Sequence, residues 1–146
     1  MKPDWILLAN STRARLLQQE RSDRVTELET FDHPQSRSKI SELVDDRAGH
    51  ESTDRSYGGA SYQPRTDAKQ KEQQRFAREI AEFLERQALA GSYRSLAVFA
   101  SSPFLGALKA ELGSATTKLL SGTHDLDLTS VGPAELGRRI AREMAH

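Results

Sequence analysis

The stretch Ser101-Ser102-Pro103 follows an apolar run and opens a helix-like pattern, so its serines could serve as a nucleophile, a phosphate cradle or a helix cap. A nucleophilic serine needs a base and an oriented partner, as in a Gly-x-Ser-x-Gly turn, and the flanking glycines of that motif are absent. A serine followed by proline is typical of a helix start, because the hydroxyl accepts from a free amide and proline has no amide to satisfy. We therefore predict that Ser102 caps a helix beginning at Pro103, and we assign no catalytic residue.

A second polar group, Asn10 to Arg13, directly follows the apolar run at residues 5–9. If this run and the one at 96–100 form neighbouring parallel strands, both carboxyl ends open at one edge of a sheet, where open α/β sheets bind ligands. Amides at a helix start favour negative charge, and the Arg13 guanidinium can hold a phosphate or carboxylate. The predicted binding site for an anion or RNA consists of Asn10, Ser11, Thr12, Arg13, Ser101 and Ser102. An ordinary turn with a solvated arginine is the alternative interpretation.

A third candidate is His124-Asp125-Leu126-Asp127, since a histidine with two acids can bind a metal or exchange protons. A metal site needs converging ligands, and the other histidines are remote in the sequence. The alternation of polar and apolar residues also fits an exposed strand or loop end. We therefore expect neither a metal site nor a cofactor.

The long polar segment at residues 33–66 predicts a loop, because it lacks a sustained apolar period and contains glycines and a proline. Basic residues are interleaved with aromatic ones in it and could contact RNA by charge and stacking; they are Arg47, Arg55, Tyr57, Tyr62 and Arg65. Interspersed acids dilute the positive field; they are Asp45, Asp46, Glu51 and Asp54. A mobile, solvated loop is therefore the alternative.

The composition indicates one globular domain over residues 1–146, with 36% hydrophobic and 29% charged residues. Its 21 basic residues balance 21 acidic ones, which argues against a strongly basic nucleic-acid coat but allows a local patch. The absence of cysteine excludes disulfides, thiolate zinc sites and cysteine nucleophiles. The apolar run near the N-terminus is too short for a signal peptide or a membrane span, so we expect a cytoplasmic protein without membrane contact.

The periodicity predicts the order strand–strand–strand, loop, helix–strand–helix–strand–helix. The predicted strands are at 5–9, 14–19, 25–31, 96–100 and 116–120. The first helix is capped by Thr66 or Asp67 and ends at Gly91, and its apolar stripe comprises Phe76, Ile80, Phe83, Leu84 and Ala88. The second carries Leu105, Leu108 and Leu112, and the third opens with Pro133 and carries Leu136, Ile140 and Met144. Apolar strands separated by helices, with early strands joined by tight turns, predict a mixed three-layer α/β domain.

The ordered stretches WILLANSTRARLL, SSPFLGALKAEL and DLDLTSVGPAELGRRI resemble the bacterial host attachment protein family over nearly the whole chain. The resemblance implies a relationship to the middle domain of archaeal and eukaryotic translation release factors, which has a ribonuclease-H-like fold. It further implies a five-stranded mixed sheet flanked by helices and a ribosome-associated role. The family name describes an attachment phenotype, and the resemblance carries no catalytic residues across.

A ribonuclease-H-like fold raises the question of nuclease activity, which needs carboxylates that converge on two metal ions. The strand at 5–9 lacks the acid that such nucleases carry there, since Asp4 precedes it and Asn10 follows it. The leading hypothesis is therefore a non-catalytic cytoplasmic binding module that engages the ribosome or RNA. The alternative is a small hydrolase or phosphate-ligand enzyme that uses the crevice between residues 10–13 and 101–102. A surface attachment factor is a third hypothesis, and the oligomeric state stays open.

Overall fold

The computed structural model describes residues 2–32 and 62–145. Its strands and helices, in chain order, are β1 (Asp4–Ala9), β2 (Arg13–Arg21), β3 (Arg24–Asp32), α2 (Tyr62–Leu89), β4 (Ser95–Ala100), α3 (Phe104–Glu111), α4 (Ser114–Leu119), β5 (Leu120–His124) and α5 (Pro133–Met144). None of the described helices combines the length and apolar composition needed to cross a membrane.

The five strands form one mixed sheet in the order β3-β2-β1-β4-β5. Antiparallel pairing joins β1 to β2 and β2 to β3, whereas β4 runs parallel to both β1 and β5. The predicted parallel pairing of 5–9 with 96–100 near the sheet centre is therefore confirmed. Both runs lack polar alternation because both faces of these central strands are covered.

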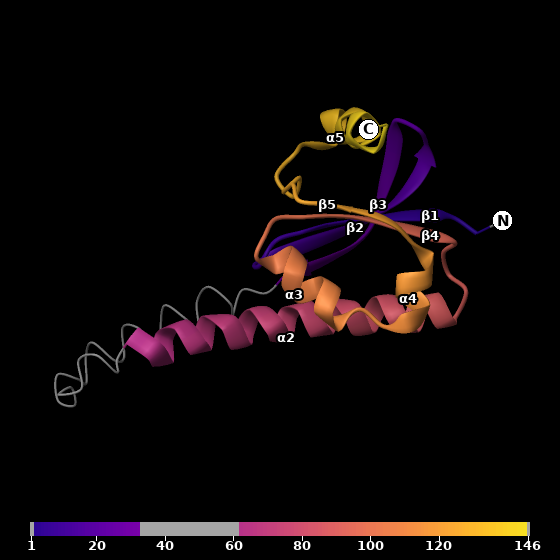
Figure 1. Cartoon of the computed structure of the whole chain (residues 1–146). Coiled ribbons are helices and arrows are strands. Elements are labelled where there is room, and N and C mark those ends of the chain that lie inside the picture. Colours follow the sequence, from indigo (N-terminus) through magenta and orange to yellow (C-terminus); the bar gives the residue numbers. More distant parts are fainter. Residues whose placement is uncertain (1, 33–61, 146) are drawn as a thin grey trace.

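Helices cover the two faces of the sheet unequally. The long helix α2, with α3 and α4, lies on one face, and α5 lies on the other (Figure 1). Residues of β1 point alternately to the two sides, so Leu7 joins the core under α2 and α3, while Ile6 and Leu8 join the core under α5. This arrangement confirms the predicted mixed α/β class. The ribonuclease-H-like assignment and the relationship to release factors remain predictions.

The predicted apolar stripe of α2 is confirmed, because Phe76, Ile80 and Leu84 are fully buried. Phe83 lies at the margin of this core, where its ring meets Phe31 edge-on at a centroid distance of 5.2 Å. The chain leaves the helix through Gly91, whose φ of +77° is a conformation that glycine adopts without strain.

The start of α2 differs from the prediction. The helix begins at Tyr62, so Thr66 and Asp67 lie within it and do not cap it. Pro64 is compatible with this earlier start, because the first turn of a helix has no internal partners for its amides. Residues 33–61 of the predicted loop, which include Arg47, Arg55 and Tyr57, lie outside the described residues.

The predicted strand at 116–120 is wrong. This part of the chain forms α4, and β5 follows at Leu120. The carboxylate of Glu85 on α2 accepts hydrogen bonds from the amides of Ala115 and Thr116 at 3.2 and 3.0 Å, and from the Thr116 hydroxyl at 2.9 Å. These bonds satisfy free amides at the start of α4, so a tertiary contact overrides the β propensity of threonine.

The C-terminal helix begins at Pro133 as predicted. Leu136 and Ile140 are buried beneath it, whereas Met144 is 37% exposed because it lies in the last turn. The predicted helix after Pro103 is also present, and Leu105 and Leu108 face the core.

Candidate functional site

The carboxyl ends of β1 and β4 lie side by side, because Ala9 pairs with Ala100 in the parallel register. Asn10 and Ser101 therefore continue the two strands at the same edge of the sheet. The segment that links β5 to α5 supplies Asp125, Asp127 and Thr129 to this edge. We call Asn10, Ser102, Asp125, Asp127 and Thr129 the carboxyl-end cluster.

Asn10 forms hydrogen bonds with both its own turn and the β5–α5 segment. Its Oδ1 accepts hydrogen bonds from the Thr12 amide at 2.9 Å, the Thr12 hydroxyl at 3.0 Å and the Arg13 amide at 3.0 Å, which closes the β1–β2 turn. Its Nδ2 donates to Asp127 Oδ2 at 2.9 Å and to Thr129 Oγ1 at 3.1 Å. A single amide side chain therefore orders its own turn and ties that turn to the β5–α5 segment.

Ser102 does not cap α3, so that prediction is wrong. The N-cap residue is Pro103, and no side-chain cap hydrogen bond is present there. Instead, the Ser102 hydroxyl donates to Asp125 Oδ2 at 2.7 Å and the Ser102 amide donates to Oδ1 at 3.1 Å. A hydrogen bond to an ionised acceptor is stronger than one between neutral groups, which explains why the hydroxyl faces Asp125.

The Ser102 amide lies where we predicted an anion, and it binds a carboxylate of the same chain. Two hydrogen bonds from Ser102, first that of its hydroxyl and then that of its amide, lower the pKa of Asp125 below the ordinary value of 3.8. A general base needs a pKa near the working pH, so this carboxylate is a weak base toward the Ser102 hydroxyl. The two hydrogen bonds hold the Ser102 hydroxyl and amide against the Asp125 carboxylate.

Asp127 is also ionised at neutral pH. Burial raises its pKa, but hydrogen bonds from Asn10 and Thr129, with the nearby charge of Arg13, outweigh burial and lower the pKa overall. The Thr129 hydroxyl donates to Asp127 Oδ1 at 2.6 Å, and the Thr129 amide donates to the same oxygen at 2.9 Å. The carboxylates of Asp125 and Asp127 therefore place negative charge at the edge of the sheet that we predicted to bind an anion.

The remaining predicted site residues lie near this edge without converging on one point. Ser11 and Thr12 are half-buried in the turn, and Arg13 is exposed at the start of β2. Ser101 is half-buried, and its carbonyl accepts the Leu105 amide at 3.0 Å. The structure therefore brings Asn10, Thr12 and the Arg13 amide together in the turn, whereas Ser102 pairs with Asp125.

His124, Asp125 and Asp127 turn to different partners. The His124 ring stacks on Phe99 with a centroid distance of 4.3 Å, while Ser102 and Asn10 engage the two acids. Within residues 2–32 and 62–145, no three histidine, aspartate or glutamate side chains gather closely enough to hold a metal ion.

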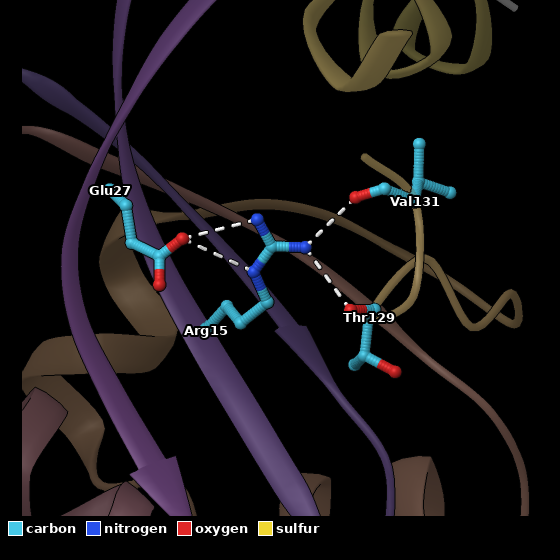
Figure 2. Close-up of polar contacts among 4 residues, drawn as sticks. All are labelled: Arg15, Glu27, Thr129 and Val131. Carbon is cyan, nitrogen blue, oxygen red and sulfur yellow. Dashed lines mark hydrogen bonds and ion pairs between the residues drawn. The ribbon is translucent and has the colours of Figure 1, made fainter. Parts of the chain in front are cut away.

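Arg15 is a structural residue that we did not single out from the sequence. Its guanidinium donates to Glu27 Oε1 at 3.1 and 3.3 Å and to the carbonyls of Thr129 and Val131 at 3.1 Å each (Figure 2). It thereby fastens the β5–α5 segment to β2 and β3. The sequence contained one signal for this role, because Arg15 is a charged residue within the apolar pattern of a strand. In the structure, the Arg15 side chain is only 13% exposed.

A family model described as a protein required for attachment to host cells matches residues 5–140. The match runs from β1 into α5 and therefore includes the carboxyl-end cluster. A search of curated proteins finds no match to the chain.

Proposed function

The chain belongs to the family of proteins required for attachment to host cells, and from this premise we propose that it is a non-catalytic cytoplasmic module that binds the ribosome or RNA. The family description names a cellular outcome and no chemical step. The ribosomal partner follows from the expected relationship of this family to the middle domain of translation release factors. In this proposal, attachment to host cells is an indirect consequence of an intracellular role.

One observation carries the non-catalytic part of the proposal. The Ser102 hydroxyl, which belongs to the one serine of the carboxyl-end cluster, donates to an ionised carboxylate whose pKa is lowered. Serine activation requires a base that takes the proton at the working pH. Asp125 instead gains hydrogen bonds by staying ionised, which favours a structural role for the pair.

The alternative is a small hydrolase or phosphate-ligand enzyme that uses residues 10–13 and 101–102. The short contact of 2.7 Å between the exposed Ser102 and Asp125 favours it, since a carboxylate lies in direct reach of a hydroxyl. The lowered pKa of Asp125 and the negative charge of Asp127 count against an anionic substrate at this edge.

Sedimentation of tagged full-length protein from lysate through a sucrose gradient tests the proposal. We expect the protein to travel with ribosomal particles at low salt and to be released by high salt or by ribonuclease, because phosphate contacts weaken with ionic strength. Protein that stays at the top of the gradient at low salt would contradict the proposed partner. Cell fractionation in parallel tests the location, and predominantly extracellular protein would contradict it.

The variant Ser102→Ala separates the two functions. A binding module retains its sedimentation profile when the hydroxyl is removed. A hydrolase loses its activity on a panel of ester and phosphoester substrates by orders of magnitude, while Ser101→Ala serves as the matched control for folding. Activity that disappears only in the folded Ser102 variant would favour the alternative.

A further inference from the structure

A second polar hollow lies at the other end of the sheet from the carboxyl-end cluster. Gln19 of β2 pairs with Asp4 at the start of β1, so the β2–β3 turn lies far along the strands from Asn10. A pocket of about 440 Å³ is lined by this turn and by the first half of α5. Its lining residues are Arg21, Asp23, Arg24, Val25, Pro133, Ala134 and Gly137. We call it the turn–α5 pocket.

The walls of this pocket are fixed by a close contact. A Cβ atom on Gly137 would overlap the carbonyl of Asp23 and lie 3.3 Å from the Cα of Arg24. Glycine therefore lets α5 pack directly on the backbone of the turn. This contact fixes the position of α5 against the backbone of the β2–β3 turn, beside which the pocket lies.

The charge of the pocket is unbalanced toward positive. Arg21 and Arg24 are both exposed at its rim, and within the described part of the chain neither guanidinium makes an ion pair or a side-chain hydrogen bond. Asp23 is the one acid that lines it. The N-terminal end of α5 adds the positive end of a helix dipole, which the carboxylate of Glu135 in the same turn offsets in part.

The positive charge continues from the pocket along α5. Ala134, Arg138 and Arg142 are spaced by four residues, so they share one face of the helix, and both arginines are exposed. Arg139, by contrast, pairs with Glu143 at 3.6 Å. Arg21 and Arg24 at the pocket are thus followed by Arg138 and Arg142 along α5. This spacing of positive charges suits a polymer that carries a negative charge on each unit.

We propose that the turn–α5 pocket binds a phosphate group of an RNA backbone, with Arg138 and Arg142 contacting further phosphates of the same strand. The inference rests on the proposed engagement of RNA and names the surface responsible. The guanidinium fork matches phosphate geometry and stays charged at every relevant pH. A membrane surface fits less well, because an interfacial helix must insert an apolar face and α5 buries its own, Leu136 and Ile140, against the sheet.

The test is binding of a fluorescein-labelled uridine 15-mer to the full-length protein, followed by fluorescence anisotropy across a salt series. The variant Arg21→Gln/Arg24→Gln should bind about tenfold more weakly at low salt, and the slope of log K against log salt should fall by about 1.4, since each contact to a single strand contributes about 0.7. The variant Arg138→Gln/Arg142→Gln provides a second measurement of the same surface and should also lower the slope.

The matched control is Arg86→Gln/Lys118→Gln, which removes two exposed positive charges from α2 and α4 on the opposite face of the sheet. We expect it to leave the affinity within about twofold, because phosphate contacts act locally at moderate salt. An equal loss in the control would show a general charge effect and overturn the site. Circular dichroism confirms that each variant is folded.

The outcomes separate this inference from the proposed function. If the wild type binds RNA and ribosomes but both arginine pairs can be replaced without effect, the turn–α5 pocket is wrong and the proposed function stands. If the wild type binds neither RNA nor ribosomes, both the assignment of the turn–α5 pocket and the proposed function are overturned. If it binds vesicles of anionic lipid and no RNA, the RNA assignment is overturned. Inorganic phosphate should shift the amide resonances of residues 22–25 and 134–138, and shifts confined to the carboxyl-end cluster would contradict the pocket.

Discussion

Ser102 donates two hydrogen bonds to the carboxylate of Asp125, one from its hydroxyl at 2.7 Å and one from its amide at 3.1 Å. The two residues are 23 positions apart and join the loop after β4 to the loop after β5. The pair therefore connects the ends of two parallel strands. Its consequence for stability depends on the charge of Asp125, which makes the contact testable by pH.

Replacing Ser102 with Ala should lower stability in a pH-dependent manner. The folded pKa of Asp125 is depressed below 3.8, so the stability that the pair contributes is present above this value and is lost as the pH falls through the folded pKa. Urea unfolding should show a lower midpoint for the variant at neutral pH and a shrinking difference toward pH 3. Ser101→Ala should lack this pH-dependent difference, and a difference that grows in acid would refute the pairing.

Replacing Asn10 with Asp should destabilise the protein at neutral pH, because a new carboxylate would face Asp127 and the donor to it would be gone. Protonation relieves the repulsion between the two acids, so the deficit relative to wild type should narrow as the pH is lowered. Asn10→Ala removes the hydrogen bonds of both Oδ1 and Nδ2 without adding a charge, and it should cost about 1–3 kcal/mol of unfolding free energy that does not narrow in acid in the same way. A deficit of Asn10→Asp that stays constant as the pH is lowered would show that the charge of Asp127 does not act on position 10.

Replacing Phe76 with Ala should cost about 3–5 kcal/mol of unfolding free energy, because this ring is fully buried and its removal leaves a cavity. Phe83→Ala should cost less, since this ring is half-buried at the margin of the core and the sequence alone had placed it inside. Chemical denaturation of both variants measures the order. A larger loss for Phe83 would mean that the packing of α2 has been misassigned.

Replacing Glu85 with Ala should loosen α4. The Glu85 carboxylate accepts from the amides of Ala115 and Thr116, and hydrogen bonds from Thr116 and Ala115 lower its pKa despite the opposing effect of burial. Hydrogen exchange at these amides should accelerate in the variant. Glu82→Ala, an exposed position on the same helix, is the matched control, and comparable acceleration in both would contradict a specific role for Glu85.

Two glycine-to-alanine variants should have opposite effects. Gly137→Ala places a methyl group against the Asp23 carbonyl, so it should destabilise the protein by about 1–3 kcal/mol. Gly106→Ala meets no atom within 4 Å in α3, where alanine is the better helix former, so it should be stabilising by about 0.5–1 kcal/mol. Thermal unfolding reports both signs, and a neutral Gly137 variant would show that α5 does not pack tightly on the turn.

The sequence by itself determined the elements whose signal is local. Two apolar runs without alternation predicted central strands, and the four-residue spacing from Phe76 to Leu84 predicted the buried face of α2. Pro133 predicted the start of α5. Because parallel strands align their carboxyl ends, the same reasoning correctly placed Asn10 and Ser101 at one edge of the sheet.

Only the tertiary structure decided which partners these residues take. Thr116 lies in a helix because Glu85, 31 residues away, supplies an acceptor for its amide, and Ser102 turns from the cap because Asp125 lies within reach. A polar side chain can form hydrogen bonds of similar energy with several different partners. The neighbouring residues in the sequence do not show which of these partners it takes. The fold brings one partner, a charged carboxylate, to hydrogen-bond distance. That partner decides whether the side chain caps a helix, lines a binding site or forms a hydrogen bond to a carboxylate within the chain.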